Sequence, residues 1–268
     1  MPSARRTALL ALASLPLAYL LVVGLVFALQ RQLLFPAPPP RSMQVPEGAR
    51  LVEIPGDPPG WALWSPPSGD APVLVAFHGN GEQLADESYE LLAYRPLGVG
   101  FFAIELPGYG PCAQQKPSEA ALYAAAEAGL RRLTGELGVP RGQVVLLGRS
   151  LGTGIAVEMA RRGWGRRLVL ISPFTSIPDV ARRSLPFLPV GLLARDRFDN
   201  LSKAPHIEIP ALVAHGEADG VVPFALGRRL ARAFPHAEWV PLAATGHDDV
   251  FDRHPELHER IAQFARRR

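Results

Sequence analysis

The chain has 268 residues, of which 48% are hydrophobic and 20% are charged, and its formal net charge at pH 7 is +3. Such a composition is typical of a globular protein with enough length for one well-packed domain. The positive charges are scattered and form no clustered basic face with a recognisable module, so nucleic-acid binding is not expected. The single cysteine, Cys112, excludes an intramolecular disulfide.

The N-terminal segment Thr7–Leu29 carries no charge and is interrupted only by Ser14, Pro16 and Gly24. At 1.5 Å per residue a helix of this length spans roughly 34 Å, enough to cross the hydrocarbon core of a bilayer. A cleaved signal peptide has an apolar core of only about 7–15 residues, although Val26-Phe27-Ala28 loosely resembles a cleavage site. We therefore predict an uncleaved transmembrane signal anchor over residues 7–29.

The charges that flank this segment suggest its orientation. Arg5 and Arg6 precede it, and the positive-inside rule then leaves residues 1–6 as a cytoplasmic tail and the rest of the chain on the non-cytoplasmic side. Arg31 and Arg41 on the other side partly offset this bias. Residues 30–47 are rich in proline and are expected to form a stiff, extended linker that keeps the following domain, residues 48–268, a short way from the membrane.

Strands and helices alternate along residues 48–268. Two opening strands are expected to be antiparallel, and the others should form a doubly wound, mostly parallel sheet of the α/β class with flanking helices. Ser118 is placed to cap a helix over Glu119–Gly138, and a last helix is expected over Pro255–Arg268. The predicted strands are Arg50–Ile54, Trp61–Trp64, Val73–Phe77, Phe101–Glu105, Gln143–Leu147, Arg167–Ile171, Ala211–Ala214 and Trp239–Leu242.

The pentapeptide Gly148-Arg149-Ser150-Leu151-Gly152 fits the pattern G-x-S-x-G and directly follows a predicted strand. A helix is expected to begin at Leu151 and to continue to Arg162. A strand that ends in this pattern and continues as a helix is a nucleophile elbow. The glycines are needed because the serine occupies a strained turn in which neighbouring side chains would collide.

Other motifs of a serine-hydrolase site lie on either side of this elbow. His78-Gly79-Asn80-Gly81 follows the strand Val73–Phe77, and His215-Gly216-Glu217-Ala218-Asp219 follows the strand Ala211–Ala214. Thr245-Gly246-His247-Asp248-Asp249 comes last, just before the final helix. The chain order of serine, acid and histidine is typical of hydrolases with a nucleophile elbow.

On these motifs, residues 48–268 resemble the α/β-hydrolase superfamily, and most closely its compact, membrane-anchored serine hydrolases related to the prolyl-oligopeptidase and serine aminopeptidase branch. The resemblance implies an α/β-hydrolase fold with Ser150 as nucleophile, His247 as general base and Asp219 as the acid that orients the base. It also implies an oxyanion hole formed by the backbone N–H groups of Asn80 and Leu151.

The residue types suit this chemistry. A serine hydroxyl needs an adjacent base, a carboxylate fixes the tautomer of that base, and two N–H groups stabilise the oxyanion. Asp179 is the main rival for the acid because it follows the strand Arg167–Ile171, while Asp248 and Asp249 lie too close to His247 in the chain. The remaining competitors for the acid are Glu217, Asp196 and Asp199, and we interpret His78 and His215 as turn-shaping residues and Arg149 as a structural partner.

No metal site and no cofactor are expected, because the sequence contains no H-E-x-x-H, no paired cysteines and no phosphate-binding G-x-x-x-x-G-K-[ST] loop. The predicted function is a serine hydrolase that cleaves an ester or thioester through an acyl-enzyme, with a small-molecule or lipid-like substrate. A serine peptidase with the same residues, and a catalytically silent binding protein of the same fold, remain as alternatives.

The segment Ser172–Pro210, between two predicted strands, is long enough for a short lid but not for a large cap domain. Its first part, Pro173–Arg195, is apolar in places, through Ile177, Val180, Leu185, Phe187, Leu188, Val190, Leu192 and Leu193. These side chains are expected either to line an acyl pocket or to pack on the core, and the sequence leaves both open.

Overall fold

An eight-stranded sheet runs through the protein in the computed structural model, which describes residues 2–267 and gives side-chain surroundings from Leu15 onward. The strand order is β1-β2-β4-β3-β5-β6-β7-β8. Only the pairs β1·β2 and β2·β4 are antiparallel, and all other neighbours are parallel. The strands are β1 (Arg50–Ile54), β2 (Gly60–Ser65), β3 (Val73–Phe77), β4 (Gly100–Ile104), β5 (Val144–Arg149), β6 (Arg167–Ile171), β7 (Ala211–Gly216) and β8 (Ala237–Leu242).

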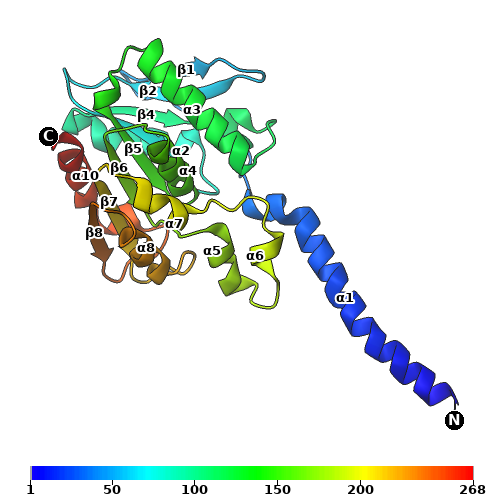
Figure 1. The fold of residues 1–268 in the computed structure, drawn as a ribbon. Helices are drawn as coiled ribbons and strands as arrows, with labels where there is room; N and C mark the ends of the chain where they lie inside the picture. The colour runs from blue at the N-terminus through cyan, green and yellow to red at the C-terminus, as the bar shows by residue number, and fades with distance from the viewer. Residues whose placement is uncertain (1, 268) are drawn as a thin grey trace.

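Helices cover both faces of this sheet, which is why its central strands are apolar throughout (Figure 1). One face packs against α3 (Glu119–Gly135), α4 (Leu151–Arg161) and α8 (Phe224–Ala231). The other face packs against α2 (Leu84–Tyr94) and α10 (Glu256–Arg266). The predicted doubly wound α/β architecture is therefore confirmed.

The element boundaries differ slightly from the predicted ones. α3 ends at Gly135 instead of Gly138, because Gly138 adopts a φ of +71° that a helix does not accommodate. The final helix begins at Glu256 and ends at Arg266, and the predicted end at Arg268 lies outside the described residues. These shifts of a few residues do not alter the faces that the helices bury.

Residues 172–210 form the lid, a segment of short helices between β6 and β7. It contains α5 (Ile177–Ser184), α6 (Val190–Leu193), α7 (Asn200–Lys203) and the 3-10 turn η4 (Ala204–His206). Outside the lid, the other short helices are η1 (Arg95–Leu97), η2 (Gly110–Cys112), η3 (Arg141–Gln143) and α9 (Val250–Arg253). The lid is short, as expected, and it lies beside the base of α1 (Figure 1).

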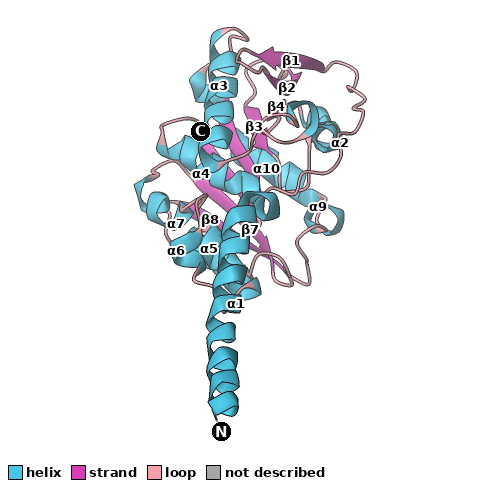
Figure 2. Ribbon diagram, turned by 90° about the vertical axis from the view of Figure 1, so that its right-hand side faces the viewer, coloured by secondary structure: helices cyan, strands magenta, loops and turns pink. Residues whose placement is uncertain are grey.

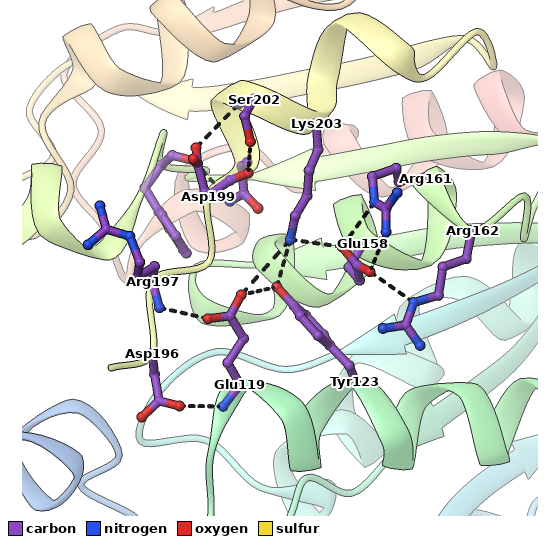
Figure 3. A network of polar contacts seen from close by, with 12 residues as sticks. Glu119, Tyr123, Glu158, Arg161, Arg162, Asp196, Arg197, Asp199, Ser202 and Lys203 are labelled. Carbon is purple, nitrogen blue, oxygen red and sulfur yellow. Dashed lines mark hydrogen bonds and ion pairs between the residues drawn. The ribbon is translucent and has the colours of Figure 1, made fainter. Parts of the chain in front are cut away.

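A partly buried polar network connects the lid to α3 and α4 (Figure 3). Lys203 Nζ donates to Tyr123 Oη at 2.9 Å and lies 2.8 Å from Glu158 Oε2. Glu119 of α3 receives the backbone N–H of Arg197 at 2.7 Å. Burial alone would raise the pKa of Glu158, but hydrogen bonds from its basic neighbours outweigh burial and lower the pKa to about 2. The carboxylate is therefore ionised at neutral pH and stabilises the lid against the helix that begins at the elbow.

The N-terminal helix α1 (Pro2–Leu34) projects away from the rest of the molecule, and its N-terminus is far from the sheet (Figures 1 and 2). Its segment Leu15–Leu34 has a mean hydropathy of 1.8, is not buried by other parts of the structure, and is apolar and long enough to cross a membrane. This helix is thus a candidate single-pass anchor. Its predicted orientation stays a prediction.

The structure corrects the expected spacer between helix and domain. Residues 30–34, assigned to the linker, belong to α1. The next residue, Phe35, is only 5% exposed, and its ring packs against that of Phe198 in the lid at a centroid distance of 6.5 Å. The proline-rich segment therefore does not separate the two parts, since burial of one aromatic side chain attaches the base of α1 directly to the lid.

Candidate active site

Ser150 lies in the sharp turn between β5 and α4, where the elbow pattern places it. Its backbone adopts φ +48° and ψ −116°, a sparsely populated region for a residue with a side chain. Its N–H donates to the carbonyl of Ile171 at 2.9 Å and connects the turn to the neighbouring strand. A Cβ on Gly152 would collide with the carbonyl oxygen of Phe77, and one on Gly148 would lie 2.5 Å from the carbonyl oxygen of Gly152. Both glycines are thus required by close backbone packing.

The structure brings the predicted serine, histidine and acid together from three loops at the carboxyl end of the sheet. His247 Nε2 is 2.9 Å from Ser150 Oγ, and His247 Nδ1 is 2.7 Å from Asp219 Oδ2. Asp219 follows β7, and His247 follows β8. Because parallel strands end at one edge, residues separated by long stretches of sequence meet there. The result is a continuous hydrogen-bonded chain from hydroxyl to carboxylate.

The loops that carry the acid and the histidine are joined by their backbones. The N–H of Glu217 donates to Leu242 O at 2.9 Å, and the N–H of Ala218 donates to Thr245 O at 2.9 Å. Asp219 Oδ1 accepts the N–H groups of Val221 and Val222 at 2.9 and 2.7 Å. These bonds occupy the second carboxylate oxygen and leave Oδ2 directed toward the imidazole.

His215 is a contributor to this site that the sequence did not reveal. Its Nε2 lies 3.2 Å from Asp219 Oδ2 and 3.0 Å from Val222 O, and both partners are acceptors. Nε2 therefore carries the proton and donates to both. The i,i+4 spacing of His215 and Asp219 across a strand end was the available signal, but a histidine at that position is equally compatible with shaping a turn.

The surroundings of Asp219 favour its ionised form. Its side chain is completely buried, which by itself raises the pKa. Hydrogen bonds from His215 and His247, the charge of His247 and the N–H of Val222 outweigh this effect and hold the pKa of Asp219 well below its usual range. A permanent negative charge next to an imidazole favours the protonated, imidazolium form of the ring.

The two predicted oxyanion-hole residues belong to segments that adjoin Ser150. Leu151 is the first residue of α4, where N–H groups precede the helical hydrogen-bond ladder and the helix dipole is positive. Asn80 lies in the loop after β3. The preceding residue, Gly79, is so close to Ser150 that a Cβ added to this glycine would lie 3.4 Å from Ser150 Cβ. The side chain of Asn80 accepts from Tyr109 Oη at 2.5 Å and donates to Leu34 O at 2.8 Å. These bonds position the loop and connect it to the end of α1.

Arg149, next to Ser150, is a structural partner in this arrangement, in line with its interpretation from the sequence. Its guanidinium lies 2.6 Å from Glu82 Oε1 in the loop after β3 and donates to Asp248 O at 3.3 Å in the histidine loop. Glu82 also accepts the N–H of Gly79 at 2.5 Å. One side chain thus connects the elbow to both neighbouring loops.

The other acids considered from the sequence have different partners. Asp179, the main rival, accepts from Thr175 Oγ1 at 2.7 Å and pairs with Arg182 on the lid. Asp196 binds Arg31, and Asp249 accepts the N–H of Gly246 at 2.6 Å. Within the described part of the chain, Asp219 is the carboxylate placed at the second imidazole nitrogen of His247.

His78, in the loop that carries Asn80, is part of a buried pair. Its Nε2 lies 2.9 Å from Glu105 Oε1, and burial of the ring lowers its pKa, but the hydrogen bond and charge of Glu105 raise the pKa to about 9. Glu105 also accepts the N–H of Leu84 at 3.0 Å. The pair stabilises the loop after β3, which agrees with a turn-shaping role.

Residues 2–267 contain no group of three or more His, Cys, Asp or Glu side chains that could hold a metal ion. Cys112 is buried in the turn η2, and burial raises the pKa of its thiol to about 11. A thiol with such a pKa is protonated at neutral pH and is a poor nucleophile.

The fold and the elbow together define an α/β hydrolase. A family model for the alpha/beta hydrolase family matches residues 73–205. An uncharacterized protein of Mycobacterium tuberculosis is 30% identical over 244 residues, which cover 88% of this chain and 85% of that protein. A putative alpha/beta hydrolase of Acanthamoeba polyphaga mimivirus is 30% identical over 186 residues, 67% of this chain and 68% of the viral protein. The chain belongs to the α/β-hydrolase superfamily, whereas the prolyl-oligopeptidase branch stays a prediction.

A human relative and two solved structures extend this picture. Human alpha/beta hydrolase domain-containing protein 17B is 32% identical over 200 residues, 72% of this chain and 65% of the human protein. An esterase from Pyrococcus furiosus superposes with a TM-score of 0.67 at 16% identity, covering 84% of this chain and 97% of the esterase. A membrane phospholipase A superposes with a TM-score of 0.59 at 18% identity, covering 98% of both chains. The structural likenesses show the shared fold, and the superfamily supports a hydrolase.

An apolar cavity of about 220 Å³ lies between α1 and the lid. Four of the eight apolar lid residues expected in an acyl pocket line it, namely Ile177, Leu185, Val190 and Leu193. The other four, Val180, Phe187, Leu188 and Leu192, do not, and Phe187 is 86% exposed. Ile177 both lines the cavity and packs on the core, so the two alternatives left open by the sequence each apply to part of the lid. The cavity is lined by Val26, Phe27, Gln30, Leu33 and Leu34 of α1 and by Ile177, Pro178, Ala181, Ser184, Leu185, Val190, Leu193, Ala194 and Asp196 of the lid.

Proposed function

We propose that the protein is a membrane-anchored serine hydrolase that cleaves carboxylic esters or thioesters with lipid-like acyl groups. The observation that carries the proposal is the chain of hydrogen bonds from Ser150 Oγ through His247 to Asp219, at 2.9 and 2.7 Å. Together these residues supply a nucleophile, a base in reach of its proton and a carboxylate that orients the base.

In the proposed reaction, Ser150 Oγ attacks the substrate carbonyl while His247 Nε2 takes the hydroxyl proton. The oxyanion is stabilised by the backbone N–H groups of Asn80 and Leu151, each contributing about 3 kcal/mol. His247 returns the proton to the leaving alkoxide or thiolate, and the acyl-enzyme forms. A water molecule, deprotonated by the same imidazole, then releases the acid and restores Ser150.

Three observations favour an apolar acyl substrate. The cavity beside the lid is walled by α1, which is apolar enough to cross a membrane. Leu34, in its wall, is one hydrogen bond from Asn80 in the oxyanion loop. The likeness to a membrane phospholipase A covers 98% of this chain and therefore extends over most of α1.

The first test is labelling with a fluorophosphonate probe, which reacts with an activated serine. We expect the wild type to be labelled and Ser150→Ala not to be, while Ser68→Ala, a change at an exposed serine in the loop before β3, keeps full labelling. An unlabelled but folded wild type would contradict a hydrolase mechanism and would favour a binding protein of this fold. Cleavage of aminoacyl amides in preference to acyl esters would favour a peptidase.

The acyl cavity is tested separately. Leu185→Trp should fill the cavity. It should lower kcat/KM for long-chain esters by about tenfold relative to short-chain esters, because the long acyl chain would lose a few buried methylene contacts. Leu188→Trp, on the same lid but outside the cavity wall, is the matched control and should leave the chain-length preference unchanged. Equal effects on short and long chains would place the acyl group elsewhere.

A further inference from the structure

The lid lies along α1 instead of only meeting its end. Near the base of the helix, Arg31 binds Asp196 at 2.8 Å and Gln30 Oε1 accepts the N–H of Arg195 at 2.8 Å. Nearer the N-terminus, Tyr19 Oη donates to the carbonyl of Phe187 at 2.9 Å. Since α1 rises 1.5 Å per residue, the contacts from Tyr19 to Arg31 extend over about 18 Å of helix.

This contact determines the depth of the lid if α1 crosses a bilayer. The apolar part of the helix ends at Gln30 and Arg31, and Tyr19 lies about 16 Å from that end, roughly half the thickness of a hydrocarbon core. If the membrane ended at Tyr19 instead, the apolar residues before it would form only about 18 Å of helix, too little to span. Thus a spanning α1 places the carbonyl of Phe187 within the leaflet that surrounds the base of the helix.

The surface of the lid suits that environment. The lid tip, residues 187–192, exposes Phe187 by 86% and Leu192 by 89%. Single exposed apolar residues are ordinary on soluble proteins, but these two are neighbours of a helix whose own leucines are exposed, such as Leu20 and Leu25. Phe187 and Leu192 thereby extend the exposed apolar side chains of α1 onto the lid tip, where the guanidinium of Arg197 donates to the carbonyl of Gly191 at 2.6 Å.

Polar groups mark the other limit of this surface. The guanidinium of Arg195 lies 4.1 Å from the ring centroid of Phe27, and Arg31 is 47% exposed beside it. Arginines at the end of an apolar helix and aromatic rings beneath them are typical of the lipid headgroup level. The apolar cavity begins at the level of these charges, where Leu34 and Asp196 line it, and extends to their membrane side, where Val26 and Phe27 line it.

We propose that the lid tip is inserted in the acyl region of the bilayer next to α1, so that a lipid acyl chain enters the cavity from the membrane without crossing water. The proposal rests on α1 being a membrane anchor, as in the proposed function, and adds the lid as a second embedded element. Because the contact between α1 and the lid tip lies at mid-membrane depth, the lid tip has no position in water.

The test measures how deep the lid tip lies in the bilayer, with the full-length protein reconstituted in phosphatidylcholine and phosphatidylglycerol vesicles. Cys112→Ser removes the native thiol, and single cysteines at Phe187→Cys, Leu192→Cys, Leu20→Cys or Leu51→Cys carry an environment-sensitive fluorophore. Leu20 is adjacent to Tyr19 on α1 and marks the same depth, whereas Leu51 is an exposed apolar residue on β1, at the far end of the molecule from α1 (Figures 1 and 2). Quenching by lipids brominated on the acyl chain is compared with quenching by aqueous iodide.

We expect brominated lipid to quench the probes at positions 187 and 192 to an extent within about twofold of that at position 20. The probe at position 51 should be quenched by iodide only. If position 20 is quenched by lipid but 187 and 192 respond to iodide, the lid is in water and the proposal is overturned while the anchor stands. If position 20 also responds only to iodide, the anchor itself fails. Lid probes shielded from both quenchers would indicate a second copy on the lid tip and would also overturn the proposal. Fluorophosphonate labelling of each variant reports the active site independently.

Discussion

The carboxyl edge of the sheet and the lid differ in what positions them. At the edge, Ser150, Asp219 and His247 each follow a buried strand by a few residues and are connected by backbone and side-chain hydrogen bonds. The lid has short helices, exposed apolar side chains and contacts to α1 through Arg31 and Tyr19. The positions of the residues at the edge are therefore determined by the core, whereas the position of the lid depends on a helix outside the core.

This difference suggests a division of roles. Catalytic geometry tolerates displacements of only a fraction of an ångström, and strand ends in a packed sheet provide that precision. A lid with the proposed role of admitting an apolar substrate from a membrane needs fewer stabilising contacts and a surface compatible with lipid. Substitutions in the two regions should accordingly differ in size and in kind.

The largest effect on activity is expected at the acid. In Asp219→Asn the amide can donate to His247 Nδ1 and favour the wrong tautomer, so kcat should fall about 10⁴-fold with little change in KM. Steady-state hydrolysis of a short soluble ester measures this. Asp248→Asn, an exposed neighbour of the histidine, is the control and should keep kcat within about twofold. A similar loss in both variants would contradict the assignment of the acid.

The same substitution should change how stability depends on pH. Because the pKa of Asp219 is held below its value in the unfolded chain, about 3.9, its ionisation stabilises the fold above that pH, and the stabilisation is lost as pH falls through the folded pKa. The difference in free energy of unfolding between wild type and Asp219→Asn should be constant above about pH 5 and narrow below about pH 4. Urea unfolding from pH 3 to 6 measures this difference.

Packing at the elbow should produce a large effect on stability. In Gly152→Ala the added Cβ would collide with the carbonyl of Phe77 and force β3 and α4 apart, so the free energy of unfolding should drop by about 3 kcal/mol. Gly135→Ala, at the end of α3 with open space around it, is the matched control and should change stability by about 1 kcal/mol or less. An unchanged midpoint for Gly152→Ala would show that the turn can relax.

A smaller effect on activity is expected at His215. His215→Phe removes the N–H that donates to Asp219, and kcat/KM should fall by about 10–100-fold, the equivalent of one hydrogen bond to a charged group. His215→Gln, which keeps a donor, should restore part of the loss, and His236→Phe, at an exposed position, should have no effect. Full activity in His215→Phe would mean that the backbone N–H groups suffice to position the acid.

The smallest effect on catalysis is expected at the junction of lid and α1. Arg31→Met removes the bond to Asp196, whose side chain is only 4% exposed, and tryptic cleavage at Arg182 or Arg183 in the lid should accelerate by about tenfold. Hydrolysis of a short soluble ester should change by less than about twofold. Arg41→Met, which removes a surface ion pair with Asp86, should leave lid cleavage unchanged. Equal cleavage rates in both variants would show that α1 does not stabilise the lid.

Much of the molecule was accessible from the sequence alone. The apolar strands, the elbow around Ser150 and the loops that carry Asn80, Asp219 and His247 are encoded locally, because each motif adjoins a strand whose pattern is continuous and apolar. The chain order of serine, acid and histidine, together with the parallel sheet, then implied that these loops meet at one edge. The meeting of Ser150, Asp219 and His247 at one edge of the sheet could therefore be predicted from local motifs and chain order alone.

Other features were decided only by tertiary structure. The pairing of His215 with Asp219, the bond of Asn80 to Leu34 and the contacts of Arg31 and Tyr19 with the lid join segments whose sequences carry no signal for one another. Apolar patterns in α1 and the lid are compatible with several neighbours, so they predict burial but not the partner. Packing in three dimensions selected the partner, and it placed a direct contact between α1 and the lid where a spacer was expected.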